Sequence, residues 1–309
     1  MRSNLGPDID LAARLFTELR DAGFDGVGIT REAYGPGEQK AHALVRAEAE
    51  ALGLEIANDA AGNLYMTLPG RDRSAKRIVL GSHLDSVPQG GNYDGAAGVL
   101  AGLATVAGMR HAGFVPARDI TVLAVRAEEA GAWFPTSYPG SHAALGRLPP
   151  EVLSVRRMDT GRTLEEHMRE LDFDPDVVRA GKGVLGPHNT AAYLELHIEQ
   201  GPVLDAQEIP VAIVTGIPGS RRLRAARVVG EYNHSGATRP SPWRNWRTGW
   251  TSTGRRWRRR VIAWCAPSAF WPRRKRRALP RSRARRAFNW TYAACSAPVW
   301  MRCLPNCTG

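Results

Sequence analysis

"KRIVLGSHLDSVPQGGNYDGAAGVLAGLATVAGMRHAG", residues 76–113, contains the clearest indication of the fold class. Its apolar residues Ile78 to Leu80 predict a buried strand that runs out into a polar loop. Residues 94–113 are rich in Ala, Gly and Leu, which predicts a helix whose small side chains let it pack closely on a sheet. A strand, a glycine-rich loop and a helix in this order are typical of α/β proteins.

The flanking segments extend this pattern. Residues 8–23 and 37–55 carry apolar residues at helical spacing, and residues 56–70 predict two short strands around a turn. Two further strands, at 118–131 and 193–205, each end in polar groups. Because strands alternate with helices, we expect an α/β fold with a largely parallel sheet and a site at the carboxyl ends of its strands.

Polar side chains gather at these predicted strand ends: His83, Asp85, Asp94, Glu128, Glu129, His197, Glu199 and Gln200. Imidazole and carboxylate groups together are ligands that Zn²⁺ and similar divalent ions accept. His83 and Asp85 share one side of an extended segment, so the carboxylate is placed to accept a hydrogen bond from the imidazole. A lone histidine or a lone acidic pair is usually structural, but the combined pattern predicts metal-assisted hydrolysis.

Several longer motifs resemble one family. "GSHLDSVPQGGNYDGAAGVLAGL", "EEAGAWFPTSYPGS", "LELHIEQGPVLD", "VTGIPG" and "GEYNHSGAT" stand in the order found in M20-type metallo-amidases of the hydantoinase/carbamoylase group. This group includes N-carbamoyl-L-amino-acid hydrolases, allantoate amidohydrolases and β-ureidopropionases. The resemblance runs from about residue 8 to residue 240, and "HIEQGP" and "NHSGAT" are typical of this group rather than of M20 peptidases.

The resemblance implies a site with two divalent ions, drawn from zinc, manganese, cobalt or nickel. His83 and His197 would bind one ion, Asp94 would bridge the two, and Glu129 would bind the other. The implied reaction is cleavage of a C–N bond in a ureido or N-carbamoyl compound, such as an N-carbamoyl-L-amino acid or allantoate.

The resemblance also assigns roles to residues around the ions. Glu128 would be the general base, Asp85 the partner that orients His83, and Gln200 a contact on the substrate side. His234 would stabilise the oxyanion and bind substrate, often in the site of the other subunit of a homodimer. The implied domains are a catalytic domain at 1–215, the beginning of an inserted α+β lid or dimerisation domain at 216–240, and a tail at 241–309.

The net charge of +12 is concentrated in that tail. Residues 241–309 contain 17 Lys and Arg but no Asp, Glu or His, whereas residues 1–240 hold 25 basic and 30 acidic side chains. The tail also contains all four cysteines and eight of the nine tryptophans. No apolar run is long enough to span a membrane and no secretion signal precedes the first helix, so we expect a cytoplasmic protein.

Two interpretations of the tail remain open. Basic residues with interleaved tryptophans are found in nucleic-acid-binding arms. The same composition, without acidic residues, is typical of a GC-rich gene translated in a shifted frame, and this is the interpretation we favour. Since the family takes a further histidine ligand from beyond the lid domain, we expect an incomplete second metal site and impaired activity. The alternative is an inactive remnant that serves only as a binding protein.

Overall fold

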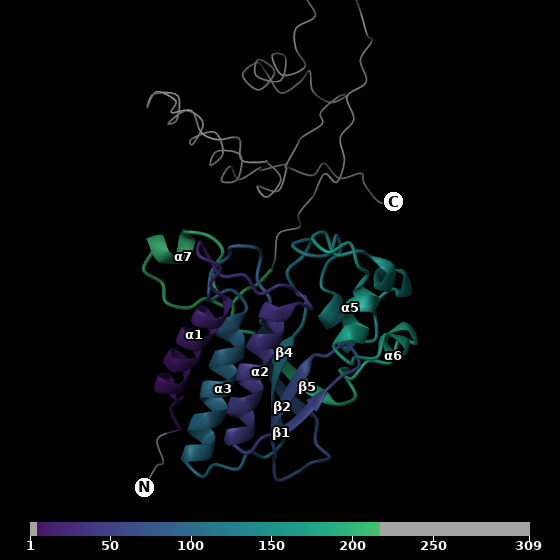
Figure 1. Ribbon diagram of the computed structural model, residues 1–309. Coiled ribbons are helices and arrows are strands. Elements are labelled where there is room, and N and C mark those ends of the chain that lie inside the picture. Colours follow the sequence, from purple (N-terminus) through teal and green to yellow (C-terminus); the bar gives the residue numbers. More distant parts are fainter. Residues whose placement is uncertain (1–4, 217–309) are drawn as a thin grey trace, which may run out of the picture. The chain divides into compact units, whose positions relative to one another are not determined.

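The structure is a computed structural model that describes residues 5–216 of the chain. The chain divides into two compact units, Met1–Ala212 and Ile213–Gly309. The first unit is a sheet covered by helices, which confirms the predicted α/β class (Figure 1). The expected lid segment and tail lie outside the described residues from residue 217 onward.

The sheet has five strands in the order β1-β2-β4-β3-β5. Their bounds are β1 Glu55–Asn58, β2 Leu64–Leu68, β3 Arg77–His83, β4 Ile120–Val125 and β5 Thr190–Leu194. Strands β4 and β5 both pair in parallel with β3, whereas β2 is antiparallel to β4 and to β1. The sheet is therefore mixed rather than largely parallel, because the β1–β2 hairpin adds antiparallel strands at one edge.

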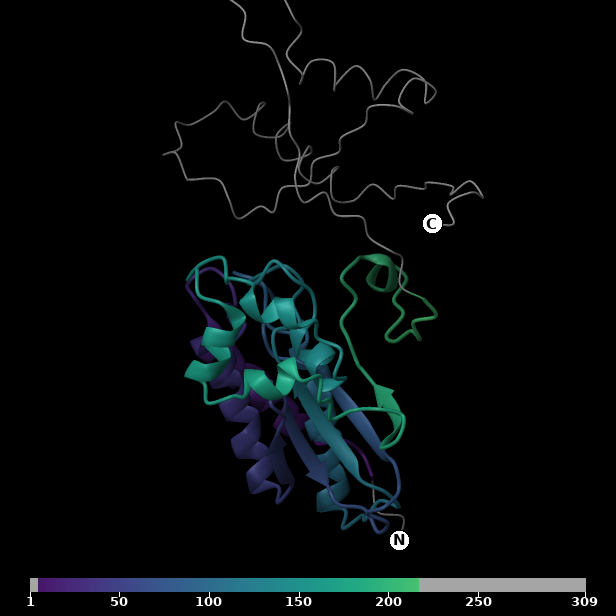
Figure 2. The same cartoon turned by 90° about the vertical axis from the view of Figure 1, so that its right-hand side faces the viewer.

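Helices α1 (Ile9–Gly23), α2 (Pro36–Ala51) and α3 (Ala96–His111) lie together on one face of the sheet (Figures 1 and 2). Alternate residues of β4 divide between two cores, as strand geometry requires. Val122 packs with the buried leucines of the helices, and Leu123 packs on the opposite face. Helix α3 approaches β3 so closely that a Cβ at Gly98 would lie 2.6 Å from Ser82 Cβ, which agrees with the predicted small-residue helix.

Residues 127–179 pack around a second buried cluster that includes Phe134, Leu153 and Leu164. This region contains the short elements α4 Pro139–Ala144, η1 Pro150–Ser154, α5 Leu164–Glu170 and α6 Pro175–Arg179. Helix α5 begins with a capping box, in which Thr163 and Glu166 satisfy each other's backbone N–H groups. The region lies beside the end of the sheet at which β3 and β4 terminate.

The strand predicted at 193–205 is largely wrong, because β5 begins earlier, at Thr190, and shares only residues 193 and 194 with the predicted range. Strand β5 ends at Leu194, the last residue paired with β3, and the polar residues 195–200 follow as an irregular segment before α7 (Val203–Ala206). Tyr193 and Leu194 are 44% and 54% exposed, so β5 is an open edge among the described strands. No helix within residues 5–216 combines the length and apolar character needed to cross a bilayer.

Candidate metal centre

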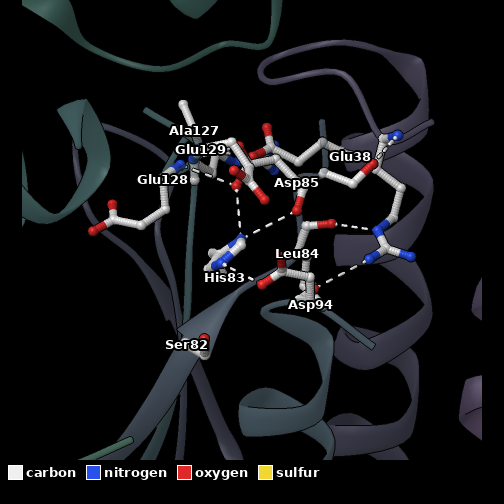
Figure 3. A network of polar contacts seen from close by, with 12 residues as sticks. Glu38, Ser82, His83, Leu84, Asp85, Asp94, Ala127, Glu128 and Glu129 are labelled. Atoms are coloured by element: carbon white, nitrogen blue, oxygen red, sulfur yellow. Dashed lines mark hydrogen bonds and ion pairs between the residues drawn. The ribbon is translucent and has the colours of Figure 1, made fainter. Parts of the chain in front are cut away.

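The carboxyl ends of the parallel strands bring the predicted polar residues together. His83 is the last residue of β3 and pairs in register with Val125, the last residue of β4. Asp85 follows the first strand and Glu128 and Glu129 follow the second, so the polar groups lie in one network at this edge (Figure 3). The edge is where ligands bind in α/β sheets, as expected from the sequence.

His83 and Asp85 are in contact, as their spacing predicts. His83 Nδ1 lies 3.2 Å from Asp85 Oδ1 and 3.1 Å from the Asp85 carbonyl oxygen. Burial of the imidazole disfavours its charged form, but the carboxylates of Asp85, Glu129 and Asp94 together outweigh this effect and raise the pKa of His83 to about 9. With Nδ1 engaged by Asp85, Nε2 is the nitrogen that remains for a metal ion.

Asp94 lies between the two histidines. Its Oδ1 atom is 3.9 Å from His83 Nε2 and 3.2 Å from His197 Nε2. The loop reaches this position through Gly95, which has a φ of 65° and lies so close to His83 that a Cβ would be 2.4 Å from the imidazole. A glycine is therefore required at this point, in agreement with the tight turn predicted for this loop.

His83, Asp94 and His197 form a group that fits a divalent metal ion. One ligand atom from each lies within 4.8 Å of the others. Asp94 Oδ1 is buried, and among the described residues it faces two imidazole nitrogens, His197 Nε2 at 3.2 Å and His83 Nε2 at 3.9 Å. Two imidazoles and a carboxylate are a donor set that Zn²⁺ accepts, so the residues present suit a metal ion at this place.

The Glu128 and Glu129 backbone amides bind the same aspartate. Glu128 N–H donates to Asp85 Oδ1 and Glu129 N–H donates to Asp85 Oδ2, both at 3.0 Å. Burial raises the pKa of each glutamate to about 7. The Glu128 carboxylate accepts a hydrogen bond from Ser141 Oγ at 2.7 Å, and its side chain extends away from His83 (Figure 3).

Among the described residues, the other predicted site residues do not join the group of His83, Asp94 and His197. Glu129 lies outside the group formed by His83, Asp94 and His197. The Gln200 amide donates to Asp94 Oδ2 at 2.7 Å, whereas it was predicted to face the substrate. The Glu199 carboxylate accepts the backbone N–H groups of residues 203 and 204 at the start of α7. His234 lies outside the described residues.

Two residues that contact the site, Arg31 and Ser141, could not be identified from the sequence. The Arg31 guanidinium is buried and donates from Nε to the Leu84 carbonyl at 2.5 Å, between His83 and Asp85. Ser141 binds Glu128 from the start of α4. Both contacts join segments more than ten residues apart. The spacing of apolar residues along the chain predicts helices and strands, but it does not predict such long-range contacts. "YPGS" belonged to a family motif, but nothing in its residues pointed to Glu128.

Asp85→Asn is expected to weaken metal binding to the whole chain by about 10–100-fold, the usual cost of losing a partner that orients a ligand. The amide can no longer accept from His83 and both glutamate N–H groups at once. Zn²⁺ affinity measured by competition with a chromophoric chelator checks this result. Asp119→Asn, just before the opposite end of β4, is the control. Equal affinities of the two variants would refute the orienting role.

Comparison with known proteins gives a consistent set of relatives. A family model described as peptidase family M28 matches residues 63–152. The chain is 41% identical over 229 residues to an N-carbamoyl-L-amino acid amidohydrolase of Geobacillus stearothermophilus, a match that covers 73% of this chain and 55% of the relative. It is 35% identical over 214 residues to the allantoate amidohydrolase of Bacillus subtilis (strain 168), covering 68% and 50%.

Solved structures agree with the sequence matches. A hydantoinase/carbamoylase family amidase from Burkholderia multivorans superposes with a TM-score of 0.59 and 30% identity, covering 66% of this chain and 48% of that one. The chain thus spans about half the length of the proteins it matches.

Proposed function

We propose that this chain, a homologue of the N-carbamoyl-L-amino-acid and allantoate amidohydrolases with the fold of hydantoinase/carbamoylase amidases, is built for metal-dependent hydrolysis of a C–N bond in a ureido compound. The observation that carries the proposal is the group of His83, Asp94 and His197 at the carboxyl edge of the sheet. Its histidines come from the motifs "GSHLDS" and "ELHIEQG", so sequence motif and geometry support the same site.

In this proposal His83, Asp94 and His197 would hold one ion, since the Nε2 atoms of both histidines face Asp94 Oδ1. Asp94 and Glu129 would serve as ligands of a second ion. Divalent ions bound there would supply Lewis acidity, which lowers the pKa of water from 15.7 toward about 7. Zinc, manganese, cobalt and nickel are all compatible with imidazole and carboxylate ligands.

Glu128 is the proposed general base. Burial raises its pKa to about 7, which suits a group that must both take and return a proton near neutral pH. The Ser141 hydroxyl donates to one of its carboxylate oxygens and fixes the orientation of the side chain. Proton transfer by Glu128 to the leaving nitrogen would complete the cleavage of the C–N bond. His234 is proposed to stabilise the oxyanion.

The substrate class follows from the relatives, which are named for N-carbamoyl-L-amino acids and for allantoate. We propose a linear ureido compound of one of these two kinds, with Gln200 near the substrate and a homodimer as the assembly. The hydrogen bond from the Gln200 amide to Asp94 supports a place for Gln200 next to the proposed metal ligands.

We also propose that the reaction is impaired in this chain. Residues 241–309 contain no histidine, aspartate or glutamate, so this segment cannot supply the further histidine ligand that the resemblance implies for the second ion. The chain would then bind one ion tightly and turn over slowly. The domain division at residues 215 and 240 is part of the same proposal.

Hydrolysis assays test this function. The whole chain is incubated with Zn²⁺ or Mn²⁺ and with N-carbamoyl-L-amino acids or allantoate, and released ammonia is measured beside a full-length relative. We expect slow, metal-dependent turnover that Glu128→Gln removes. Turnover equal to that of the relative would refute the impairment. Tight binding of one ion without any turnover would favour the alternative of a binding protein, and no metal binding at all would refute the proposed function.

Metal affinity is expected to rise with pH. Because the pKa of His83 is raised to about 9, its imidazole carries a proton at pH 7 that a metal ion must displace. Displacement of one proton increases the apparent affinity by about tenfold per pH unit until the pH reaches the pKa of His83. Calorimetric titrations with Zn²⁺ between pH 6 and 8, in buffers of different ionisation enthalpy, measure both the slope and the protons released. A flat profile over this range would contradict the arrangement around His83.

A further inference from the structure

The turn after β4 is held by side chains from three other segments. Its consecutive backbone N–H groups all donate to side-chain oxygens: Arg126 to Asn63 Oδ1 at 2.9 Å, Ala127 to Glu38 Oε1 at 2.8 Å, and Glu128 and Glu129 to Asp85 at 3.0 Å. Ala127 has a φ of 53°, in the left-handed region that is unfavourable for a residue with a Cβ. The surroundings therefore impose this conformation on the turn.

Glu38 is the acceptor at the strained residue. It lies in the first turn of α2, and its side chain is fully buried. Its Oε2 atom accepts the Tyr34 N–H at 2.7 Å and Arg126 Nη1 at 3.0 Å, while Oε1 accepts the Ala127 N–H. Figure 3 shows this carboxylate in the same network as Asp85 and the two glutamates. Oε1 is thus committed to the backbone of the turn, and Oε2 to the Tyr34 amide and the Arg126 guanidinium.

We propose that Glu38 is a positioning residue of the candidate site, which fixes the left-handed turn at Ala127 and thereby aims Glu128 and Glu129. The effect extends to His83. The two amides that follow Ala127 donate to Asp85, and Asp85 contacts His83 Nδ1. A continuous series of contacts therefore connects α2 to a proposed metal ligand.

The neighbouring arginine makes a charged acceptor tolerable at this place. Arg126 is also buried and donates to the Gly62 carbonyl and to Gln39 Oε1, each at 2.8 Å. A buried carboxylate without such a partner would be strongly unfavourable. A purely structural ion pair needs no contact with the Ala127 amide, and this contact is what distinguishes a positioning role.

Glu38→Gln tests the inference in the metal-free whole chain. The variant keeps the shape of the side chain but replaces one acceptor oxygen with an amide, so it cannot satisfy both Tyr34 and Ala127. We expect the amides of residues 127–129 to exchange with solvent at least about tenfold faster, while those of α3 stay within about twofold. The control is Glu48→Gln on the same helix, whose partner is Arg14. It should change neither set.

A second substitution separates positioning from general stability. Ala127→Gly removes the penalty for a positive φ, so in the Glu38→Gln background it should restore part of the protection of Glu128 and Glu129. Zn²⁺ affinity should fall several-fold in Glu38→Gln and recover in the double variant. Wild-type exchange in Glu38→Gln, equal acceleration throughout the fold, or no recovery in the double variant would each overturn the inference.

The consequence for catalysis rests on the proposed function, but the exchange measurement does not. If residues 127–129 lose protection while the wild-type chain neither binds Zn²⁺ nor releases ammonia, the positioning role stands and the proposed function fails. If the chain hydrolyses ureido substrates and the exchange is unchanged, the function stands and the role of Glu38 is wrong.

Discussion

Asp94→Ala is expected to abolish metal binding at the candidate centre. Asp94 Oδ1 lies between the Nε2 atoms of His83 and His197, and it is the one carboxylate in this group of the described residues. Without it, two imidazoles remain to bind an ion, and no negative charge in the group balances the metal. Since the loss of an orienting partner alone costs about 10–100-fold in affinity, we expect a loss of at least about 100-fold here.

Equilibrium dialysis with Zn²⁺, followed by metal analysis of the protein, measures this loss. Asp21→Ala is the matched control, because Asp21 lies exposed on α1 and pairs with its neighbour Arg20. It should bind as much metal as the wild-type chain. Unfolding midpoints in urea, measured without metal, should be similar for both variants. Undiminished Zn²⁺ binding in Asp94→Ala would exclude this group as the principal metal site.

Arg126→Met is expected to destabilise the fold by about 3–5 kcal/mol, the usual cost of leaving one member of a buried ion pair without its partner. Arg126 and Glu38 are both buried and are joined by a contact of 3.0 Å. The guanidinium also lies 4.9 Å from the centre of the Phe173 ring, so packing contributes to the loss. Removing it leaves Glu38 as a buried carboxylate that faces only backbone amides.

The destabilisation should depend on pH. Burial already raises the pKa of Glu38 from 4.5 to about 7, and Arg126 opposes that rise. Without Arg126 the pKa rises further. A carboxyl group whose pKa is higher in the folded chain than in the unfolded chain binds more protons when folded, so stability falls as the pH rises through this range. The variant should therefore lose more stability at pH 8 than at pH 5.

Urea denaturation at these two pH values gives the result. Arg179→Met is the control, because Arg179 pairs with Glu165 and Asp176 at the surface, where such pairs contribute about 0–1 kcal/mol. An equal loss at both pH values, or a loss no larger than that of the control, would show that Arg126 does not compensate the charge of Glu38.

Local pattern was sufficient to predict much of the fold. The apolar run Ile78 to Leu80 and the small residues of 94–113 predicted β3 and α3, because burial and close packing leave a direct mark on composition. The direction of β1 and β2 was not predicted. It depends on the direction in which β2 pairs with β4, and that pairing is made by contacts between segments far apart in the sequence.

The candidate site was predictable where spacing or motif carried the information. His83 and Asp85 are two residues apart, and that spacing brings them into contact. His197 was identified by its motif, and it does lie beside Asp94. The support from Glu38 and Arg31 was not predictable, because a glutamate in a first helical turn and an arginine in a loop are ordinary residues of exposed surfaces. Their burial becomes evident only when the segments are packed together.

X-ray absorption spectroscopy of the whole chain loaded with one equivalent of Zn²⁺ measures directly whether His83, Asp94 and His197 bind the ion. Ligation by His83, Asp94 and His197 predicts a shell of nitrogen and oxygen atoms at about 2.0–2.2 Å, with the outer-shell scattering of two imidazoles and no sulfur. Asp94→Ala should lose this signature. Scattering from sulfur at about 2.3 Å would instead place the ion on the cysteines of residues 241–309 and would contradict the claim.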